Sequence, residues 1–234
     1  MTVRYLCYKA TILIDFQDLD ERLAAFVCRH GAEGYRLYLE ELRWPGGVEC
    51  PRCESGDVHW LERRARYHCR DCRYQFRVTA RTVLHDSHLA LSKWFVAVAL
   101  MLSTAEGISA VELRRILGGS YKSAWFLEHR IRSAMGSQDM LPAVPVAYAA
   151  PVGERRVVRQ AREAVDPGEA PPGWPLLRSV IAGAHGSVRA KYLAAYWNEA
   201  RWRYEHRDNP NAFRDTVLAL LDSPWLPYDV LTAA

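Results

Sequence analysis

Apolar residues between positions 91 and 135 recur at steps of three and four, the period of helices that bury one face. The pattern is clearest at the start of this stretch, in Leu91, Trp94, Phe95, Val98 and Leu102. Glycine and serine interrupt it near residue 107 and again at 118–120. The pattern therefore predicts three short helices.

Local signals mark the ends of the second and third helices. Ser109 and Glu112 form the S-x-x-E pattern of a capping box, in which side-chain oxygens accept hydrogen bonds from unpaired backbone N–H groups. Gly118 and Gly119 can end the second helix, and Ser120 can cap the third. Two short helices joined by a glycine-containing turn, with another helix behind, are typical of a helix-turn-helix.

The third helix separates into faces. Residues expected to pack inward are Ala124, Leu127, Ile131 and Met135. Residues expected to point outward are Lys122, Phe126, His129 and Ser133, with Tyr121, Trp125 and Arg132 on the flank. Such a helix could lie in the major groove of DNA, although an ordinary helical hairpin with a polar outer face would give the same pattern. Solvent-facing aromatic residues favour the binding interpretation.

Four cysteines ahead of these helices carry the clearest chemistry. Cys50 and Cys53 form one C-x-x-C pair and Cys69 and Cys72 a second, with fifteen residues between the pairs. This spacing is typical of a structural zinc site with four thiolate ligands. A redox disulfide would use only one pair, and iron could occupy the same four thiolates. Four cysteines fill the tetrahedron, so the metal would hold the fold and not activate water.

The remaining segments complete a fold that is mostly α with a small β zinc ribbon. We expect a helical region at 1–47 whose two short helices pack on the ribbon, the zinc ribbon at 48–86, the helix-turn-helix at 88–136, a linker rich in proline and alanine at 137–172, and C-terminal helices at 173–234. The C-terminal helices need a surface to cover, either the helix-turn-helix or a second copy of the protein.

Charge is unevenly distributed, although the net formal charge is only +4. Seven arginines stand between residues 62 and 81 against two acidic residues. Such a patch favours a polyanionic partner, and a solvated face is the alternative. We expect double-stranded DNA, contacted by Arg63, Arg64, Arg66, Arg73, Arg77, Tyr121, Lys122, Trp125, His129, Arg130 and Arg132.

Cellular location follows from what the sequence lacks. No stretch approaches the roughly 20 apolar residues of a membrane span, and the first ten residues have no signal-peptide pattern. We expect a cytoplasmic, nucleoid-associated protein without a membrane partner.

Several short motifs in a fixed order extend this picture. They are LRWPGG at 42–47, CPRC at 50–53, YHCRDCRYQF at 67–76, TARTVLHDSHL at 79–89, GISAVELRR at 107–115 and SYKSAW at 120–125. Together they resemble the N-terminal part of bacterial insertion-sequence transposases, in which a zinc ribbon precedes a DDE catalytic domain. The resemblance covers about residues 14–136. Arg81 departs from it, because the family usually has glycine in the turn after the ribbon.

The resemblance implies an RNase H-like domain whose acidic residues hold two divalent ions such as Mg²⁺ and cut and join DNA. No matching acidic strand follows the helix-turn-helix, and residues 174–204 resemble the helical tail of that domain. About 40 residues separate the two matches, whereas a core of this kind needs about 100. We therefore predict no catalytic residues.

Three functions remain open at this stage. The preferred one is a transposase-derived DNA-binding protein, truncated and without strand transfer, acting as a homo-oligomer or with a full-length transposase relative. The second is an active DDE transposase that uses Mg²⁺. The third is a zinc-ribbon module that contacts only other proteins.

Overall fold

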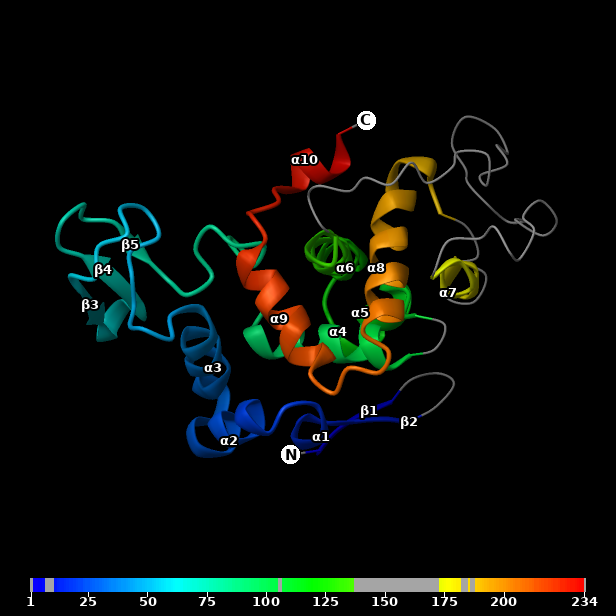
Figure 1. The fold of residues 1–234 in the computed structure, drawn as a ribbon, viewed down its shortest axis with the longest axis horizontal. Helices are drawn as coiled ribbons and strands as arrows, with labels where there is room; N and C mark the ends of the chain where they lie inside the picture. The colour runs from blue at the N-terminus through cyan, green and yellow to red at the C-terminus, as the bar shows by residue number, and fades with distance from the viewer. Residues whose placement is uncertain are drawn as a thin grey trace.

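The computed structural model of the 234-residue chain describes residues 2–6, 11–104, 107–136, 173–181, 185 and 188–233. The predicted linker at 137–172 lies outside these residues. Figure 1 shows the zinc-ribbon strands at one end of the molecule and a helical body at the other. No helix among the described residues combines the length and the apolar character needed to cross a membrane.

The chain begins with a β-hairpin that the sequence analysis did not predict. Strand β1 (Thr2–Leu6) pairs antiparallel with β2 (Thr11–Asp15), and Thr2 lies opposite Asp15. The expectation of a helical region over 1–47 is wrong for residues 2–6 and 11–15. Both strands are rich in β-branched residues, which favour an extended backbone.

Two helices follow, as predicted, and they pack against each other. After the short α1 (Phe16–Leu19), α2 (Glu21–His30) begins at Asp20, whose carboxylate accepts a hydrogen bond from the Leu23 N–H at 2.9 Å. A short 3₁₀ turn leads into α3 (Gly34–Arg43). A Cβ at Gly34 would stand 2.4 Å from the carbonyl oxygen of Phe26, so only glycine lets the helices approach this closely.

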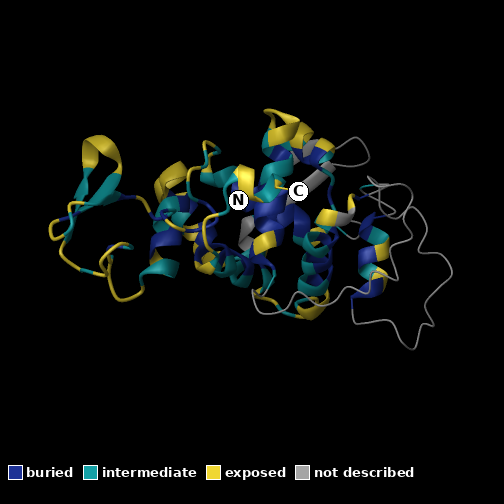
Figure 2. Cartoon of the chain, turned by 90° about the horizontal axis from the view of Figure 1, so that it is seen from above, coloured by how far each residue is buried: buried dark blue, intermediate teal, exposed yellow. Residues whose placement is uncertain are grey.

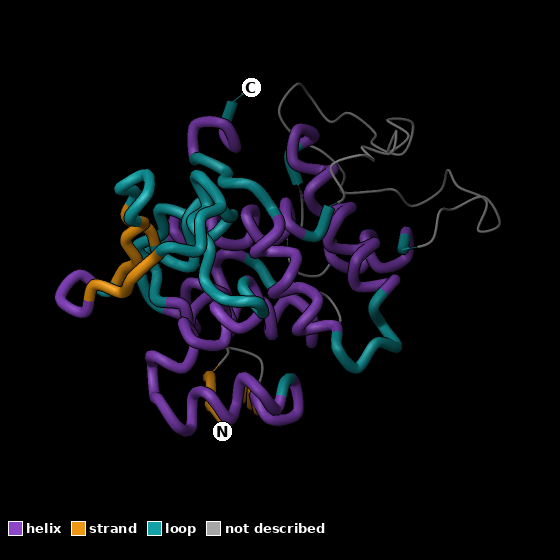
Figure 3. The backbone as a smooth tube through the Cα atoms, turned by 60° about the vertical axis from the view of Figure 1, so that its left-hand side comes forward, coloured by secondary structure: helices purple, strands orange, loops and turns teal. Residues whose placement is uncertain are grey.

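The ribbon is a three-stranded antiparallel sheet. Strand β3 (Val58–Leu61) pairs with β4 (Arg66–Cys69), which pairs with β5 (Gln75–Phe76). Long loops surround these short strands (Figure 3). A small apolar cluster of its own, separate from the main core, underlies the sheet and contains Cys50, Cys69, Phe76 and Ala80.

The three predicted helices are α4 (Leu91–Ser103), α5 (Ala110–Leu117) and α6 (Tyr121–Ala134). The hydroxyl of Ser109 accepts a hydrogen bond from the Glu112 N–H, and Ser120 does the same for Ser123. Gly118 and Gly119 have φ of 70° and 91°, the left-handed values that end a helix. These cap predictions are confirmed.

Helices follow at the C-terminal end. They are α7 (Trp174–Val180), α8 (Leu193–Glu205), α9 (Ala212–Asp222) and α10 (Tyr228–Thr232). Helix α8 packs on α6, while α9 packs on α4 and α6 and shares the main hydrophobic core with them. Helix α7 packs on α8. Within the described residues, α8 and α9 therefore cover the helix-turn-helix of the same chain.

A buried ion-pair network joins α6 to α8. The Arg132 guanidinium is fully enclosed and donates to Glu199 at 2.7 Å and to Glu128 at 3.1 Å, and it lies 4.1 Å from the centre of the Tyr196 ring. Burial alone would lower the pKa of Arg132, but the two carboxylates raise it above its usual value. The placement of Arg132 near DNA phosphates is therefore wrong for this structure.

Arg130 is buried as well and fastens two distant segments to α6. Its Nη2 donates to the His85 carbonyl at 2.8 Å and its Nε to the Leu226 carbonyl at 3.1 Å. Beside this contact, the Val83 N–H donates to the Ser223 carbonyl at 2.8 Å. The segment that leaves the ribbon and the segment that leaves α9 therefore run together across α6, and Arg130 is not available to a phosphate.

His129 faces the interior, so its predicted outward orientation is also wrong. Only 1% of its surface is exposed, and its ring lies among those of Trp125, Tyr192 and Tyr196. Burial, with a smaller contribution from the Arg132 charge, lowers the pKa of His129 to about 2. The same causes lower the pKa of His185 to about 3. Both imidazoles are neutral in the folded protein at ordinary pH.

Replacement of His129 by phenylalanine should weaken the fall in the free energy of unfolding at acid pH. Below about pH 6.5, the usual pKa of histidine, the unfolded chain takes up a proton on His129 that the folded chain does not, so stability falls as pH falls. In the wild type, this proton should lower the free energy of unfolding by about 1.4 kcal/mol for each pH unit between about pH 6 and 4. In the His129→Phe variant this contribution should be absent. Urea unfolding at several pH values measures it.

The control is the range above about pH 7.5, where His129 is neutral in both the folded and the unfolded chain. In this range the His129→Phe substitution should leave the pH dependence of the stability unchanged. If the free energy of unfolding fell equally steeply with decreasing pH in the wild type and the variant, a buried neutral His129 would be contradicted.

Candidate metal centre and nucleic-acid interface

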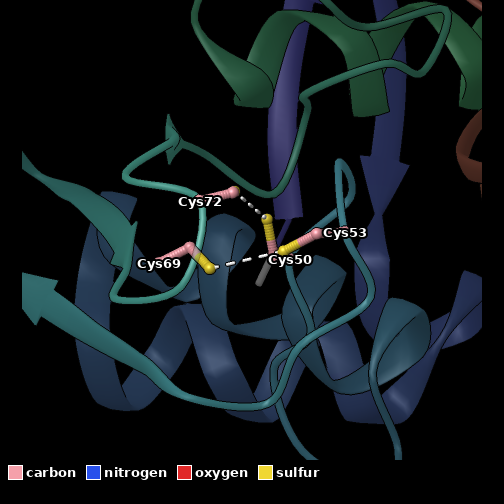
Figure 4. Close-up of side chains that lie close together, drawn as sticks. All are labelled: Cys50, Cys53, Cys69 and Cys72. Carbon is pink, nitrogen blue, oxygen red and sulfur yellow. Dashed lines mark hydrogen bonds between the residues drawn. The ribbon is translucent and has the colours of Figure 1, made fainter.

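The four predicted cysteine ligands converge on one point. Their sulfur atoms all lie within 4.8 Å of one another, and the close-up in Figure 4 shows the side chains directed inward from two loops. The Sγ atoms of Cys50 and Cys72 are 3.6 Å apart and those of Cys53 and Cys69 3.5 Å. A disulfide would need about 2.05 Å, whereas a zinc ion with Zn–S bonds of about 2.3 Å would place tetrahedral sulfurs about 3.8 Å apart.

The two C-x-x-C turns have the same backbone construction. In each turn the N–H of the first cysteine donates to the carbonyl five residues later: Cys50 to Ser55 at 2.9 Å and Cys69 to Tyr74 at 3.0 Å. The residue after each second cysteine is left-handed, with φ of 60° at Glu54 and 59° at Arg73. The repeated geometry presents two pairs of sulfurs to one metal ion.

The donor set fits a structural zinc ion. Four thiols that converge on one point from two turns are the ligand set of a tetrahedral zinc ion. Four thiolates without a fifth partner leave no coordination position for water. Binding would release the thiol protons and fix both turns, which couples metal occupancy to the folding of the ribbon.

Helix α3 carries the ribbon. The Tyr67 hydroxyl donates to Glu40 at 3.0 Å, and the Arg36 guanidinium lies 4.4 Å from the centre of the Trp60 ring. Trp44, just after α3, contacts the rings of Tyr67 and Phe76 at 6.0 Å. The prediction that an N-terminal helix packs on the ribbon is confirmed for α3, and α2 packs on α3 instead.

The predicted basic patch lies on the surface. Figure 2 shows that the ribbon end of the molecule is mostly exposed or half-buried, in contrast to the helical body. Arg63, Arg64, Arg73 and Arg77 are exposed, and Arg66 is half-buried. Arg64 donates to Gln75 at 3.2 Å, and Arg70 forms an ion pair with Asp57 at 3.2 Å across the ribbon. The patch therefore mixes paired and solvent-facing guanidinium groups.

A hollow of about 320 Å³ lies between the ribbon and the loop that leaves it. Arg66 and Arg77 line one side, and Ser87 and His88 line the other. The hollow offers two guanidinium groups together with hydroxyl and imidazole groups, and the Asp86 carboxylate lines it as well.

Arg81 occupies the turn where glycine was expected from the resemblance. Its φ is 64°, in the left-handed region that a residue with a side chain enters only at a cost. Its guanidinium donates to the carbonyl of Pro51, which lies between the two cysteines of the first pair. The turn therefore keeps the geometry that favours glycine, and the arginine adds a contact to the metal-binding loop.

The outer surface of α6 is divided between exposed and covered residues. Tyr121 is 50% exposed and Lys122 is also exposed, in agreement with their predicted positions. Trp125 and Phe126 are only partly exposed, because the ring of Tyr228 lies 6.4 Å from the first and 5.4 Å from the second. The solvent-facing aromatic pair of the sequence analysis is therefore covered by the C-terminal helix α10.

Several residues that shape this region were missed by the sequence analysis. They include Glu128, Glu199 and Tyr228. Glu128 stands four residues before Arg132 on α6, a spacing at which a carboxylate and a guanidinium can pair, and this signal favoured an internal ion pair over a DNA contact. No local signal marked Glu199 or Tyr228, since both reach α6 from distant parts of the chain.

The class of this domain is defined by a family comparison. Residues 33–75, from the start of α3 to the beginning of β5, match the family model described as "Transposase zinc-ribbon domain" (IS1595). The chain therefore carries a transposase-type zinc ribbon in which the four-cysteine cluster and its supporting helix form one unit.

One relative is named after a transposable element. Over 100 residues the chain is 32% identical to the "Uncharacterized protein in transposable element ISH50" of Halobacterium salinarum. The match spans 42% of this chain and 33% of that protein, so the chain covers about a third of the relative's length. No solved structure matches the chain.

Removal of the metal should unfold the ribbon and leave the helical body folded. Cys69→Ser, or treatment with a strong chelator, should abolish binding of one zinc ion and speed amide hydrogen exchange in β3, β4 and β5, because their small apolar cluster cannot hold them alone. Cys28→Ser is the matched control, since Cys28 is exposed and outside the cluster. Unchanged exchange in the ribbon after metal loss would refute the structural role.

The Arg81 turn predicts an unusual order of stability. Arg81→Gly should be more stable than Arg81→Ala by about 1 kcal/mol, because both lose the bond to Pro51 and only glycine relieves the left-handed backbone. At Arg63, in the 3₁₀ turn between β3 and β4, Arg63→Ala should instead be more stable than Arg63→Gly. Thermal unfolding of the four variants tests the prediction, and the same order at both sites would count against it.

Proposed function

We propose that the chain binds duplex DNA, with the ribbon contacting phosphates and the first half of α6 facing the major groove. The observation that carries this proposal is the surface of solvent-facing arginines on a transposase-type zinc ribbon, next to a helix-turn-helix. Phosphate contacts of this kind supply affinity, and groove contacts supply sequence preference.

The metal has a structural part in this proposal. A zinc ion held by the four cysteines would fix both turns and thereby the positions of Arg73 and Arg77, which follow the second turn. Every guanidinium held in place before binding reduces the side-chain entropy lost on contact with DNA.

Only the first half of α6 is offered to the groove. Tyr121 and Lys122 are exposed there, and the helix N-terminus adds a partial positive charge. The second half is committed to the fold through Arg130 and Arg132. Recognition helices commonly contact bases with their N-terminal residues. His129, Arg130 and Arg132 lie in the second half of α6, so their exclusion from the predicted contacts agrees with this geometry.

Strand cleavage is the second candidate, favoured by the transposase name of the matching family. Among the described residues, the one group of side chains arranged to hold a metal is the four-cysteine cluster. Glu128 and Glu199 are occupied by Arg132. We therefore propose binding without cleavage. Incubation of end-labelled DNA with the protein and Mg²⁺ or Mn²⁺ should leave the strands intact, and nicked or joined products would favour an active transposase.

Salt dependence should reveal the phosphate contacts. The logarithm of the affinity for duplex DNA should fall linearly with the logarithm of the salt concentration, with a slope reduced by about 0.9 for each phosphate contact removed. Arg77→Ala should reduce the slope by about one contact, because this guanidinium is exposed at the ribbon hollow. Fluorescence anisotropy between about 50 and 200 mM salt covers the useful range.

Arg70→Ala is the matched control on the same ribbon, because Arg70 is already paired with Asp57. The Arg70→Ala substitution should change the slope of log affinity against log salt concentration less than Arg77→Ala does. Affinity independent of salt in all three proteins would favour the alternative that the ribbon contacts only other proteins.

A further inference from the structure

Helix α10 lies on the side of α6 that the proposed function assigns to DNA. The Tyr228 ring sits 4.0 Å from the Lys122 ammonium and packs edge-on against Phe126. Trp125 lies between Tyr228 and Tyr192, with ring centres at 6.4 and 5.2 Å. One tyrosine of α10 therefore contacts three residues within about one turn of the predicted DNA-facing surface or its margin.

The attachment of α10 is slight compared with that of the segment before it. Residues 223–226 are held by the Val83 and Arg130 hydrogen bonds and by a β-bridge between Thr82 and Pro224. Beyond Pro227, α10 has five residues and none is buried. An isolated helix of this length is unstable in water, so α10 depends on its few contacts with the body.

A second cation holds the far end of α10. The Lys191 ammonium donates to the carbonyls of Thr232 and Ala233 at 3.0 and 3.4 Å, where the last carbonyls of a helix lack intrahelical partners. Between these two attachments α10 spans a cavity of about 860 Å³ that Trp125 and Tyr196 also line. The helix therefore bridges a hollow without filling it.

The major groove cannot accept α6 with α10 in place. The groove is about 12 Å wide and a helix with its side chains measures about 10 to 12 Å across, so the groove admits one helix and not two side by side. Contact of α10 with α6 and insertion of α6 into the groove are therefore mutually exclusive.

We propose that α10 is an intramolecular cover for the recognition surface of α6, which swings away at Pro227 when duplex DNA binds. This inference rests on the proposed DNA-binding function. The closed state covers Trp125 and Phe126 and holds the Lys122 ammonium against the Tyr228 ring. DNA binds only the open state, so the apparent affinity is the intrinsic affinity multiplied by the fraction of molecules that are open. Release leaves residues 223–226 in position.

The test compares two variants of the full chain with a matched control. Tyr228→Ala removes the ring contacts to α6, and Lys191→Ala releases the other end of α10 without touching α6. Each should bind a mixed-sequence duplex severalfold to about tenfold more tightly than the wild type, with an unchanged salt slope, since the phosphate contacts are the same. Val230→Ala, on the same helix but 59% exposed, should bind like the wild type.

The possible outcomes separate the two proposals. If the wild type binds DNA with the expected salt dependence but both variants bind equally or more weakly, the cover is refuted and DNA binding stands. If none of the proteins binds duplex DNA, both proposals fail. Hydrogen exchange gives an independent reading: DNA should accelerate exchange in residues 228–233 of the wild type, and protection of these amides on binding would overturn the cover.

Discussion

The fold depends on one enclosed guanidinium, that of Arg132. A buried charge is tolerated only when it is fully paired, and removal of either partner typically costs about 3 to 5 kcal/mol. Glu128 supplies one carboxylate from the same helix, and Glu199 supplies the other from α8. The ion pairs therefore require α8 to stay against α6. This requirement divides α6 into a half that holds the body together and a half that is left for contact with other molecules.

The zinc ribbon is attached to the rest of the chain through α3 and not through the ion pairs of Arg132. Its own apolar cluster is small, so its conformation must come from the metal and from docking on α3. The family match begins at residue 33, at the end of the turn before α3, which agrees with the dependence of the sheet on this helix. Tyr67 and Trp44 provide the shared surface. The ribbon is thus a projection mounted on a helix of the main core, with a four-cysteine cluster suited to a structural zinc ion.

Local signals explain which parts of the fold could be predicted. Capping by Ser109 and Ser120 and the glycines between the helices are contained within a few residues, so the sequence alone located α5 and α6. The cysteine spacing likewise predicted the cluster at 50–72, because each C-x-x-C turn is a local structure. The hairpin at 2–15 was missed although its composition is typical of strands.

The surroundings of α6 could not be predicted, because they come from far along the chain. A pattern with one apolar stripe suggested one buried face, yet α8 and the segment at 223–226 cover further faces of the helix. Arg130 finds its carbonyl partners 45 and 96 residues away. Polar residues such as His129 therefore looked solvent-facing until the elements that enclose them were placed.

The bond between Val83 and Ser223 has a consequence for the order of assembly during synthesis. The ribbon and its cysteines are complete well before the ribosome reaches α9, so the metal can be bound early. Its orientation relative to α6, however, is fixed by residues 223–226, which are synthesised long after the ribbon. The nascent chain can therefore hold a folded ribbon whose position relative to α6 is not yet fixed.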